Sequence, residues 1–565
     1  MTVEHTSPST PDLASQLAPY GPDLVARYQT SGLWSTTETV ASIFARATSE
    51  RPDALAVVDS LGGQLTWAEV GDRSARLGGA LQRRGVAKGD VVAVQMSNRA
   101  EAMVAVAAIA RIGAVVNPMV PAFRRGELTY MLNHCHAKAL IVPGVYRKYD
   151  HDELGIEVSR DVPSLGTVIS ISNTTREGIE TFQDLIREEP GRDVAVSPSD
   201  PTCVMFTSGT EAAPKAVVHS SNSMLASFRQ TARLLDLDET DCVFMASPFG
   251  HGSGYGIGTL MTALIRGTLV FQAEWEPSSA AELIARHRCT YAHGSTPFLQ
   301  ELSALENVSP EQLGSFRWFV TGGALIPAGL VKSARERLGC VVLRQYGQTE
   351  GFITSFNHPT DADEVLASSD GALLPEVEVQ IRSEDGNVLP EGEEGEFWIR
   401  GPHRCLGFAH DPVRTAASID PEGWLASGDV GTLDGRGRLS FKRRKKEVIN
   451  RGGYKYSAAE VESVLLQHPA VQRVAIVAMP DARLGEKACA FISPRGTSSI
   501  DLAEICRFLE KHGVAKYKWP ERLETLAELP ATSSGKIQKF ELVKLLSENN
   551  PAQAVQEDSR QGATQ

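Results

Sequence analysis

The feature that most constrains the fold is an alternation of short apolar runs with amphipathic stretches, from about residue 37 to about residue 440. The runs ALAVVD, DVVAVQM, AVVNPM and KALIVP are rich in β-branched residues and predict buried strands. The stretches AEVGDRSARLGGALQRRG and AEAMVAVAAIARIG have helical periodicity and end at Gly85 and Gly113. This alternation predicts an α/β fold, in which helices wrap largely parallel sheets.

Length and texture divide the chain further. A chain of 565 residues is too long for one hydrophobic core. After about residue 370, period-2 strands alternate with EDGN and PEGEEGE turns, which indicates a β-rich subdomain. Beyond LDGRGRLSFKRRKKEVIN, the helix SAAEVESVLLQH and the strand VQRVAIVAMP indicate a small α+β domain. We expect a disordered lead-in at 1–30, a large N-terminal body at 31–442, a linker at 443–447, a small C-terminal domain at 448–545 and a disordered tail at 546–565.

Charge and hydropathy exclude several classes of protein. The formal net charge of −13 argues against nucleic acid or an anionic membrane as a partner. The sequence contains no uninterrupted run of about 18 apolar residues, so it predicts no transmembrane helix. The start MTVEHTSPSTPDLASQ lacks the basic region and apolar core of a signal peptide, so we expect a cytoplasmic protein.

Cysteine and histidine spacing gives no metal site. No two of the eight cysteines lie within four residues of each other, so we expect buried free thiols rather than CxxC pairs. His134 and His136 flank Cys135, but residues two apart on a helix point to different faces.

The segment FTSGTEAAPKAVVHSS gathers hydroxyl and glycine residues around one lysine, directly after the predicted strand CVMF. Such loops turn backbone N–H groups toward phosphate, although a polar surface loop would have the same composition. The segment is not the GxxxxGK[ST] loop of common nucleotide hydrolases. Its candidate phosphate ligands are Thr207, Ser208, Gly209, Thr210 and Lys215.

Three further segments carry candidate residues. In LRQYGQTEG, Tyr346 can cover a flat base and Glu350 can hold a divalent cation. In GWLASGDVG, Asp429 follows Gly428 in a predicted turn, where it either binds ribose hydroxyls or closes an ordinary Asx turn. In ELPATSSGKIQKFEL, Lys536 lies on a predicted loop, where a lone lysine is most often only solvated.

Two other segments resemble known binding motifs, but each is better explained in another way. The basic run from Lys442 to Lys446 resembles a nucleic-acid patch, but the acidic chain favours an exposed interdomain linker. The segment FMASPFGHGSGYGIG, followed by TLVFQAE, resembles a dinucleotide-binding unit. Its glycines alternate and never give the GxGxxG spacing, so we reject that function.

The order of the motifs resembles the acyl-adenylate-forming superfamily, which includes acyl-CoA synthetases, luciferases and the adenylation domains of peptide synthetases. The family's [YF]TSGTTGxPKG, YGxTE, TGD, GRxK[DE]xI and PxTxSGK motifs correspond in order to FTSGTEAAPKA, YGQTE, SGD, RRKKEVI and PATSSGK. VTGGALIP and DPEGWLASGD also resemble family landmarks. The resemblance spans roughly residues 35 to 545. It implies an adenylation domain at 31–442, a hinge at 443–447 and a mobile C-terminal domain that carries the catalytic lysine.

The resemblance also implies a function and a set of site residues. ATP would activate a carboxylic acid to acyl-AMP with release of pyrophosphate, and coenzyme A (CoA) would then accept the acyl group as a thioester. Lys536, Glu350 and Thr207 would be catalytic, and Glu350 would hold Mg²⁺. The implied nucleotide ligands are Thr207, Ser208, Gly209, Thr210, Lys215, Gly323, Ala324, Tyr346, Gly347, Thr349, Asp429, Arg444 and Lys536. The implied acid pocket contains His251, Gly252, Ser253, Gly254 and Gly322, with Lys446 as the hinge and Gly453 facing the thiol.

The chain departs from the family pattern at Glu211, Ala212, Ala216 and Arg443. A solvated carboxylate at position 211 would repel triphosphate by about 1 kcal/mol, which predicts weak ATP binding or a loop that acts as a flap. Because Lys536, Glu350 and Asp429 are retained, we expect an active enzyme.

The acid and the acceptor stay open at this point. Small residues after His251 make room for an aromatic or alicyclic acid, unless the glycines only shape a turn. GAVVNPMVPAFRRGELTYMLNH also resembles ligases of such acids. The acceptor is CoA or, alternatively, a separate carrier protein or an amine. A non-catalytic nucleotide- or acyl-binding protein is a third alternative, suggested by Glu211.

Overall fold

The structure is a computed structural model, and it describes residues 13, 17–207, 214–322, 326, 328–445, 448–451, 454–481, 483–496, 498, 500–532 and 535–548. The chain divides into two compact units. The larger unit comprises Met1–Gln380, Trp398–Ser427 and Arg436–Leu439, and the smaller unit comprises Ile381–Phe397, Gly428–Gly435 and Ser440–Gln565. The expected linker at 443–447 remains a prediction.

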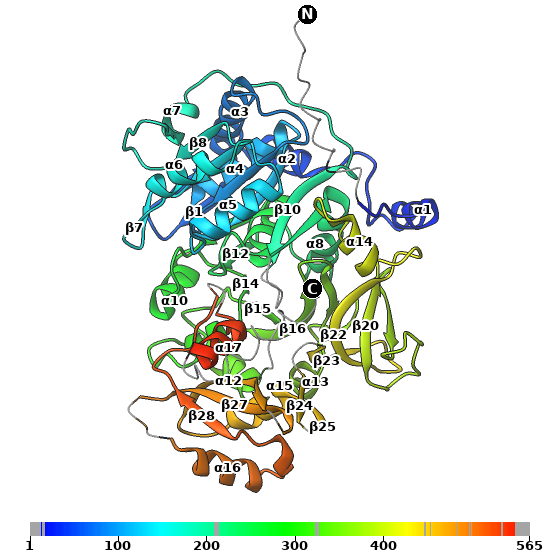
Figure 1. Cartoon of the computed structure of the whole chain (residues 1–565). Helices are drawn as coiled ribbons and strands as arrows, with labels where there is room; N and C mark the ends of the chain where they lie inside the picture. The colour runs from blue at the N-terminus through cyan, green and yellow to red at the C-terminus, as the bar shows by residue number, and fades with distance from the viewer. Residues whose placement is uncertain are drawn as a thin grey trace, which may run out of the picture. The chain divides into compact units, whose positions relative to one another are not determined.

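A nine-stranded sheet forms one layer of the larger unit (Figure 1). In spatial order its strands are β18 (Ala372–Leu373), β17 (Phe352–Phe356), β16 (Val341–Gln348), β15 (Trp318–Gly322), β14 (Tyr291–His293), β12 (Cys242–Met245), β13 (Thr268–Phe271), β1 (Leu55–Asp59) and β2 (Gln64–Thr66). The strands from β16 to β1 are parallel, and the outer pairs are antiparallel. The carboxyl ends of the parallel strands therefore meet at one edge, where α/β proteins bind ligands.

A second sheet of eight strands is also largely parallel. In spatial order its strands are β21 (Gly407–Phe408), β11 (Lys215–Ser220), β10 (Pro201–Thr207), β4 (Val115–Met119), β3 (Val91–Gln95), β5 (Ala139–Val142), β8 (Thr167–Ser170) and β9 (Glu180–Thr181). Strand β11 runs antiparallel to both of its neighbours, β10 and β21, and the other neighbouring pairs of this sheet are parallel. A small hairpin joins β6 (Val145–Tyr146) to β7 (Tyr149–Asp150).

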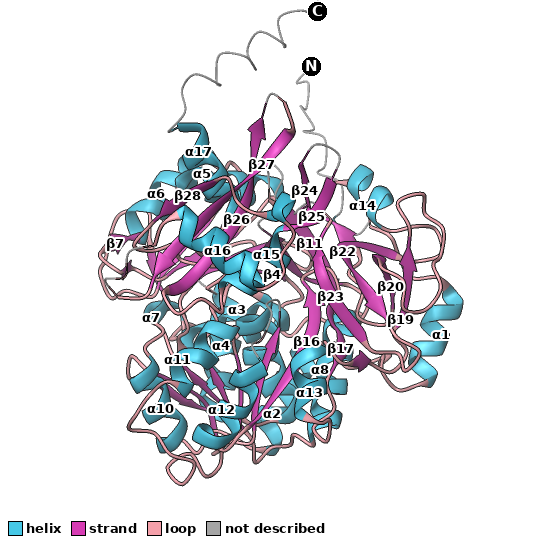
Figure 2. Ribbon diagram, turned by 90° about the horizontal axis from the view of Figure 1, so that it is seen from below, coloured by secondary structure: helices cyan, strands magenta, loops and turns pink. Residues whose placement is uncertain are grey.

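The larger unit has helices against both sheets, and α1 (Pro22–Thr30) lies apart from these sheets (Figure 1 and Figure 2). The other helices are α2 (Val40–Glu50), α3 (Trp67–Arg83), α4 (Ala100–Arg111), α5 (Arg125–His134), α6 (His151–Asp161), α7 (Phe182–Leu185), α8 (Ser221–Leu235), the π-helix η2 (Ser253–Met261), α9 (Thr262–Ile265), α10 (Pro277–Arg286), α11 (Thr296–Ser303), α12 (Ala328–Leu338), α13 (Asp363–Ser368) and α14 (Pro412–Ser418). The α/β fold predicted from the sequence is confirmed.

The sequence explains where these helices begin and how deeply they are buried. The Thr66 side chain accepts a hydrogen bond from the backbone N–H of Glu69, whose carboxylate accepts one from Thr66, so a capping box starts α3. Gly85 has φ +83° after the last turn of α3. In α4 every residue from Ala102 to Ala110 is buried, as expected for a helix that is apolar on all sides.

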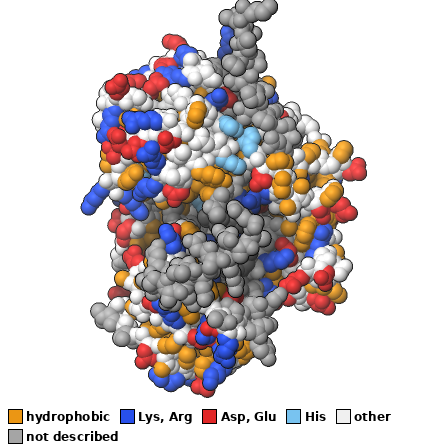
Figure 3. Space-filling view, in the orientation of Figure 1, with side chains coloured by type: hydrophobic (Ala, Val, Ile, Leu, Met, Phe, Trp, Pro, Cys, Tyr) orange, Lys and Arg blue, Asp and Glu red, His pale blue; other side chains and the backbone are white. Residues whose placement is uncertain are grey.

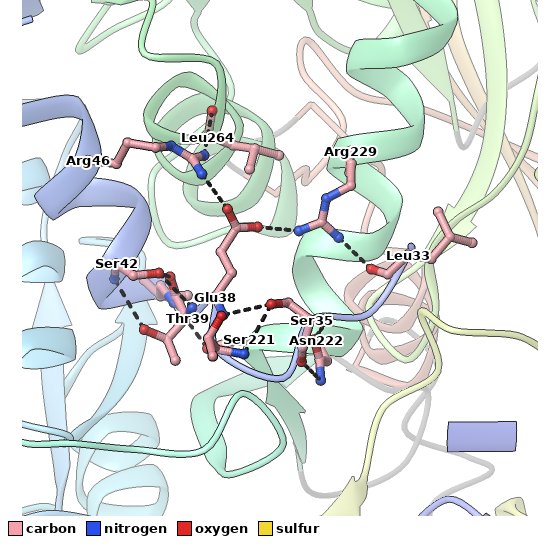
Figure 4. Close-up of polar contacts among 12 residues, drawn as sticks. Leu33, Ser35, Glu38, Thr39, Ser42, Arg46, Ser221, Asn222, Arg229 and Leu264 are labelled. Atoms are coloured by element: carbon pink, nitrogen blue, oxygen red, sulfur yellow. Dashed lines mark hydrogen bonds and ion pairs between the residues drawn. The ribbon is translucent and has the colours of Figure 1, made fainter. Parts of the chain in front are cut away.

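Polar contacts fix the segment before α2 to helix α8 (Figure 4). The Glu38 carboxylate accepts hydrogen bonds from Arg46, at 2.6 Å, and from Arg229 of α8. The Asn222 side chain accepts from the backbone N–H of Ser35 at 3.0 Å and donates to its carbonyl at 3.1 Å. These contacts hold the N-terminal segment on the larger unit.

The β-rich texture after residue 370 forms a four-stranded sheet. In spatial order its strands are β19 (Glu378–Arg382), β20 (Gly395–Arg400), β22 (Leu425–Leu433) and β23 (Leu439–Arg444). The basic run predicted as a linker is strand up to Arg444. Arg443 pairs with Glu394 at 3.0 Å, Arg444 with Asp429 at 3.3 Å and Lys445 with Glu396 at 2.7 Å. Three cations of the run therefore have carboxylate partners among the described residues.

The smaller unit contains a five-stranded sheet. Its strands are β25 (Tyr454–Ser457), β24 (Val448–Arg451), β27 (Gly485–Pro494), β26 (Val471–Asp481) and β28 (Arg522–Thr525), and its helices are α15 (Ala458–Leu465), α16 (Leu502–Lys511), the 3₁₀-helix η3 (Lys516–Lys518) and α17 (Lys539–Glu548). Val474 and Ile476 of β26 share a core with α15 and α16, which lie across the sheet in Figure 2. Ala475 and Val477, which alternate with them along the strand, face a second core formed with α17.

The described residues contain no helix long and apolar enough to cross a membrane. Nor does any group of three or more His, Cys, Asp or Glu residues in the described ranges have the arrangement of a metal site. All eight cysteines are free thiols, and seven of them are buried, as predicted. Acidic and basic side chains are interspersed over the face that Figure 3 shows.

Candidate active site

The hairpin of β10 and β11 frames the predicted phosphate loop. Thr207 ends β10 and Lys215 begins β11, and the two residues are register partners. Both are partly buried. Ser208, Gly209, Thr210, Glu211 and Ala212 lie outside the described residues. The structure therefore brings together the first and last of the predicted phosphate ligands, opposite each other at one end of the hairpin.

The YGQTE segment forms the end of β16 and a tight turn into β17. Tyr346 and Gly347 belong to the strand, and the side chain of Tyr346 is 6% exposed. A Cβ at position 347 would lie 1.7 Å from the carbonyl oxygen of Phe352, so only glycine fits there. Thr349 and Glu350 occupy the turn, which closes with a 3.1 Å hydrogen bond from the Gly351 N–H to the Gln348 carbonyl.

Residues from distant segments anchor this turn. The Nε2–H of His219, in β11, donates to the carbonyl of Thr349 at 2.7 Å. The backbone N–H of Cys405 donates to the carbonyl of Glu350 at 2.7 Å. Burial lowers the pKa of His219 to about 4, so its ring is neutral near pH 7. The backbone of the turn is thus held from two sides, which fixes the position from which Glu350 projects.

Glu350 fits the requirements of a Mg²⁺ ligand. Its side chain is partly exposed, and a carboxylate is the hard oxygen ligand that Mg²⁺ prefers. Magnesium in nucleotide enzymes usually takes one or two carboxylates, and phosphate oxygens and water complete its shell. A single carboxylate on a fixed turn is compatible with that arrangement.

The segment assigned to the acid pocket leads into a π-helix. His251 and Gly252 precede η2, and Ser253 and Gly254 open it. A Cβ at position 252 would meet Phe352 and Met205 at ordinary distances of 3.6 and 3.9 Å. A Cβ at position 254 would lie 2.2 Å from the carbonyl oxygen of Pro248. Close backbone packing therefore requires glycine at 254, whereas position 252 has room for a Cβ.

Two buried polar residues at the carboxyl edge of the nine-stranded sheet were missed by the sequence analysis. His293 ends β14, and Gln345 lies in β16, with its Nε2 2.9 Å from Nε2 of His293. Gly322, which was predicted for the acid pocket, ends β15 between them. Gly323 and Ala324 lie outside the described residues. A polar residue at the end of an otherwise apolar strand, as in YAH, was the signal available in the sequence.

In the smaller unit, Asp429 and Arg444 form an ion pair with 3.3 Å between Oδ1 and Nε. Asp429 was expected in a turn, but Gly428 and Asp429 both lie within strand β22, so the turn prediction was wrong. Gly428, with φ +71°, bends the strand without ending it. The N–H of Gly428 donates to Oε1 of Glu396 at 3.2 Å, and its carbonyl accepts from the backbone N–H of Lys445 at 2.8 Å.

Lys536 lies on an exposed loop of the smaller unit, between β28 and α17. Its backbone N–H donates to Oγ1 of Thr532 at 3.1 Å, and its carbonyl accepts from the Thr532 N–H at 2.7 Å. Gly535 has φ +82°. Thr532 and Lys536 thus hold each other's backbone, while the Lys536 residue is exposed. Lys446 and Gly453 lie outside the described residues.

Comparison with known proteins gives the family. The AMP-binding enzyme model matches residues 44–408, and the model of the AMP-binding enzyme C-terminal domain matches residues 460–536. The chain belongs to the AMP-binding enzyme family. The resemblance to acyl-adenylate-forming enzymes is thereby confirmed. Membership of this AMP-binding family supports activation of a small carboxylic acid through an adenylate, with ATP as the nucleotide.

Relatives differ in the acid and in the acceptor that their names give. The chain is 33% identical to the medium-chain fatty-acid–CoA ligase of Escherichia coli over 523 residues, 92% of each protein. The structure of the anthranilate CoA ligase AuaEII in complex with anthranoyl-AMP is similar with a TM-score of 0.82 and 26% identity, covering 91% of this chain and 99% of that one. The amide bond synthetase McbA from Marinactinospora thermotolerans has a TM-score of 0.76 and 28% identity, covering 89% and 99%.

Proposed function

We propose that the protein is an AMP-forming carboxylate–CoA ligase. The observation that carries the proposal is the family match to both parts of the chain, together with an exposed Lys536 at the last matched position of the C-terminal domain. The 33% identity to a CoA ligase over 92% of each chain favours CoA as the acceptor.

In the first half-reaction, an oxygen of the acid carboxylate attacks the α-phosphorus of ATP, and the bond to pyrophosphate breaks. Both reactants are anions, so the reaction needs cations directed at the charge that develops on the α-phosphate. Lys536 would supply one positive charge there. Glu350 would hold Mg²⁺, which when bound neutralises the departing pyrophosphate.

The remaining nucleotide contacts are proposed from the family match. Thr207 and Lys215, with the loop between them, would bind the β- and γ-phosphates. Tyr346, Gly347 and Thr349 would line the adenine side, with Gly323 and Ala324 as further contacts. Asp429 would accept hydrogen bonds from the ribose hydroxyls, and Arg444, which already pairs with it, would orient its carboxylate.

In the second half-reaction, the thiol sulfur of CoA attacks the acyl carbonyl carbon, the thiol loses its proton and AMP leaves. We propose that the C-terminal domain rotates about Lys446 between the two steps and that Gly453 then lies beside the incoming thiol. Such closure steps often limit turnover.

We propose an aromatic or alicyclic acid as the substrate, bound beside His251, Gly252 and Gly322. The room at position 252 and the similarity to an anthranilate CoA ligase support a ring. The similarity to a medium-chain fatty-acid ligase favours a flexible acyl chain instead, and the acid panel described below separates the two.

A separate carrier protein or an amine is the second candidate acceptor, and the similarity to an amide bond synthetase favours it. The discriminating experiment is pyrophosphate release over a panel of aromatic, alicyclic and fatty acids, with and without CoA, with products identified by mass spectrometry. An acyl-CoA product establishes the ligase. If acyl-AMP forms without any thioester, the acceptor is an amine or a carrier protein instead of CoA. Acid binding without AMP formation would favour a non-catalytic acyl-binding protein.

A further inference from the structure

His293 and Gln345 meet across an intervening strand. His293 pairs in register with Val320 of β15, and Gln345 pairs with Gly322 of the same strand. Gly322 has no side chain, and a Cβ there would lie 3.2 Å from Cγ of Gln345. The glycine therefore leaves the space through which the Gln345 side chain crosses β15 to reach His293.

The hydrogen bonds of this pair are incomplete. The amide of Gln345 donates to Nε2 of His293 at 2.9 Å, so the neutral ring carries its proton on Nδ1. Burial lowers the pKa of His293 to about 3, which keeps the ring neutral. Nδ1 of His293 and Oε1 of Gln345 are buried and have no hydrogen-bond partner in the structure of the described ranges. The pair thus offers one donor and one acceptor, and a flipped amide would exchange these roles without changing the count.

The pair lies where the acid is expected to bind. His293 ends a parallel strand at the edge that carries Gly322, and His251 is close enough for its charge to lower the pKa of His293 further. His293 and Gln345 are 7% and 8% exposed, and the two unpaired atoms themselves are buried. Buried polar groups in proteins nearly always find a partner, so an unpaired donor and acceptor at the expected acid site are suited to a polar ligand.

We propose that His293 and Gln345 are specificity-determining residues that select acids bearing a hydroxyl or a similar donor–acceptor substituent on the carbon skeleton. This inference rests on the proposed acid-activating function. A hydroxyl accepts from one group and donates to the other, whereas an alkyl chain or an unsubstituted ring leaves both unpaired. The site then discriminates between two acids that differ only in that hydroxyl by about 10- to 100-fold in kcat/KM.

The test compares pairs of acids with one carbon skeleton: benzoate with its three monohydroxy derivatives, cyclohexanecarboxylate with its hydroxy derivatives, and octanoate with hydroxyoctanoates. Acid-dependent pyrophosphate release gives kcat/KM for each, and calorimetry without ATP gives acid binding. Both are measured for the wild type and for Gln345→Met, which keeps the length of the side chain but removes its amide. Gln230→Met is the matched control, because Gln230 of α8 is also buried with an amide that has no partner among the described residues.

The expected result is a hydroxyl preference of at least about 10-fold in one pair, lost in Gln345→Met and kept in Gln230→Met. If Gln345→Met does not fold, His293→Phe replaces it. An equal preference in the variant and the wild type, or no preference in any pair, overturns the inference while acid-dependent pyrophosphate release still upholds the proposed function. If no acid releases pyrophosphate, the proposed function fails. Calorimetry then decides the inference alone: binding of a hydroxylated acid that Gln345→Met loses supports it, and no binding of any acid overturns it.

Discussion

The ring of His219 donates its Nε2–H to the backbone carbonyl of Thr349 at 2.7 Å, and the two residues are 130 positions apart in the chain. His219 lies in β11, the strand that Lys215 begins, and Thr349 lies in the turn that carries Glu350. One partly buried hydrogen bond therefore joins the strand that borders the phosphate loop to the proposed magnesium turn. The centroid of the His219 ring also lies 4.6 Å from the ring centroid of Phe352, which follows the turn.

His219→Phe removes this hydrogen bond and leaves a buried carbonyl without its donor. We expect kcat/KM for pyrophosphate release to fall about 10- to 100-fold, because a displaced Glu350 would misplace the phosphates. The half-saturating Mg²⁺ concentration should rise as well, which a purely structural role would not cause. A magnesium titration of the wild type and the variant measures it.

His219→Gln is the matched control for this prediction, since its amide restores a donor of similar reach. Partial recovery of the magnesium requirement supports a positioning role. If both variants keep the wild-type requirement and lose only thermal stability, His219 does not position the turn.

Much of the fold followed from local patterns. The runs ALAVVD and DVVAVQM form strands β1 and β3. They were predictable because a short continuous run of apolar residues indicates a buried strand. The turn predicted at Asp429 was wrong, because Gly428 bends strand β22 and the strand continues through it. A glycine before an aspartate has the same local signature in a bent strand as in a turn.

The polar contacts of the site could not be predicted in the same way. The partners His219 and Thr349, like His293 and Gln345, lie far apart in the sequence, and no motif pairs one with the other. Their meeting depends on strand order and register, which short-range patterns do not encode. The motif residues were accessible from the sequence because their order resembles a family. The residues that support them required the tertiary structure.

Three buried histidines predict loss of stability in mild acid. Burial lowers the pKa to about 4 for His219 and to about 3 for His293 and His403, against 6.5 in an unfolded chain. Above pH 6.5 both states are neutral at these positions, so their contribution does not change. Below pH 6.5 the unfolded chain binds protons that the folded protein does not, and stability falls until the folded pKa is reached.

Each such histidine lowers the free energy of unfolding by up to about 1.4 kcal/mol for each pH unit below 6.5. We expect the midpoint of thermal unfolding to fall between pH 6.5 and 5, before carboxylates with lowered pKa values begin to titrate. His403→Gln removes one titrating ring and should reduce this slope. An unfolding midpoint that stays constant from pH 7.5 to 5 would contradict the prediction.

Glu38 is expected to be important for the stability of the N-terminal segment. Burial alone would raise its pKa, but Arg229 and Arg46 outweigh burial and lower it (Figure 4). Glu38→Gln removes the charge between two arginine side chains that are 15% and 33% exposed. Because solvent still reaches the cluster, we expect a loss of about 1–3 kcal/mol, less than for a fully buried pair.

Glu336→Gln is the control, since Glu336 pairs with Lys332 at 3.9 Å on an open helix surface and should change stability by less than about 0.5 kcal/mol. Denaturant unfolding of both variants measures the difference. Equal unfolding midpoints would show that the arginines find other partners when Glu38 is neutral.

Lys536 should separate the two half-reactions. Lys536→Ala removes a cation from an exposed loop whose backbone is held by Thr532, so the fold of the smaller unit should be unchanged. We expect acid-dependent pyrophosphate release to fall roughly 10²–10³-fold, about 3–4 kcal/mol, as for other groups that stabilise charge in a transition state. Thioester formation from preformed acyl-AMP and CoA should be nearly unaffected, because the bond between the acid and the α-phosphate has already formed.

Lys544→Ala, on the exposed face of α17, should leave both rates at wild-type values. An equal loss in both half-reactions would mean that Lys536 supports binding of the adenylate generally, and no loss in either would remove it from the site.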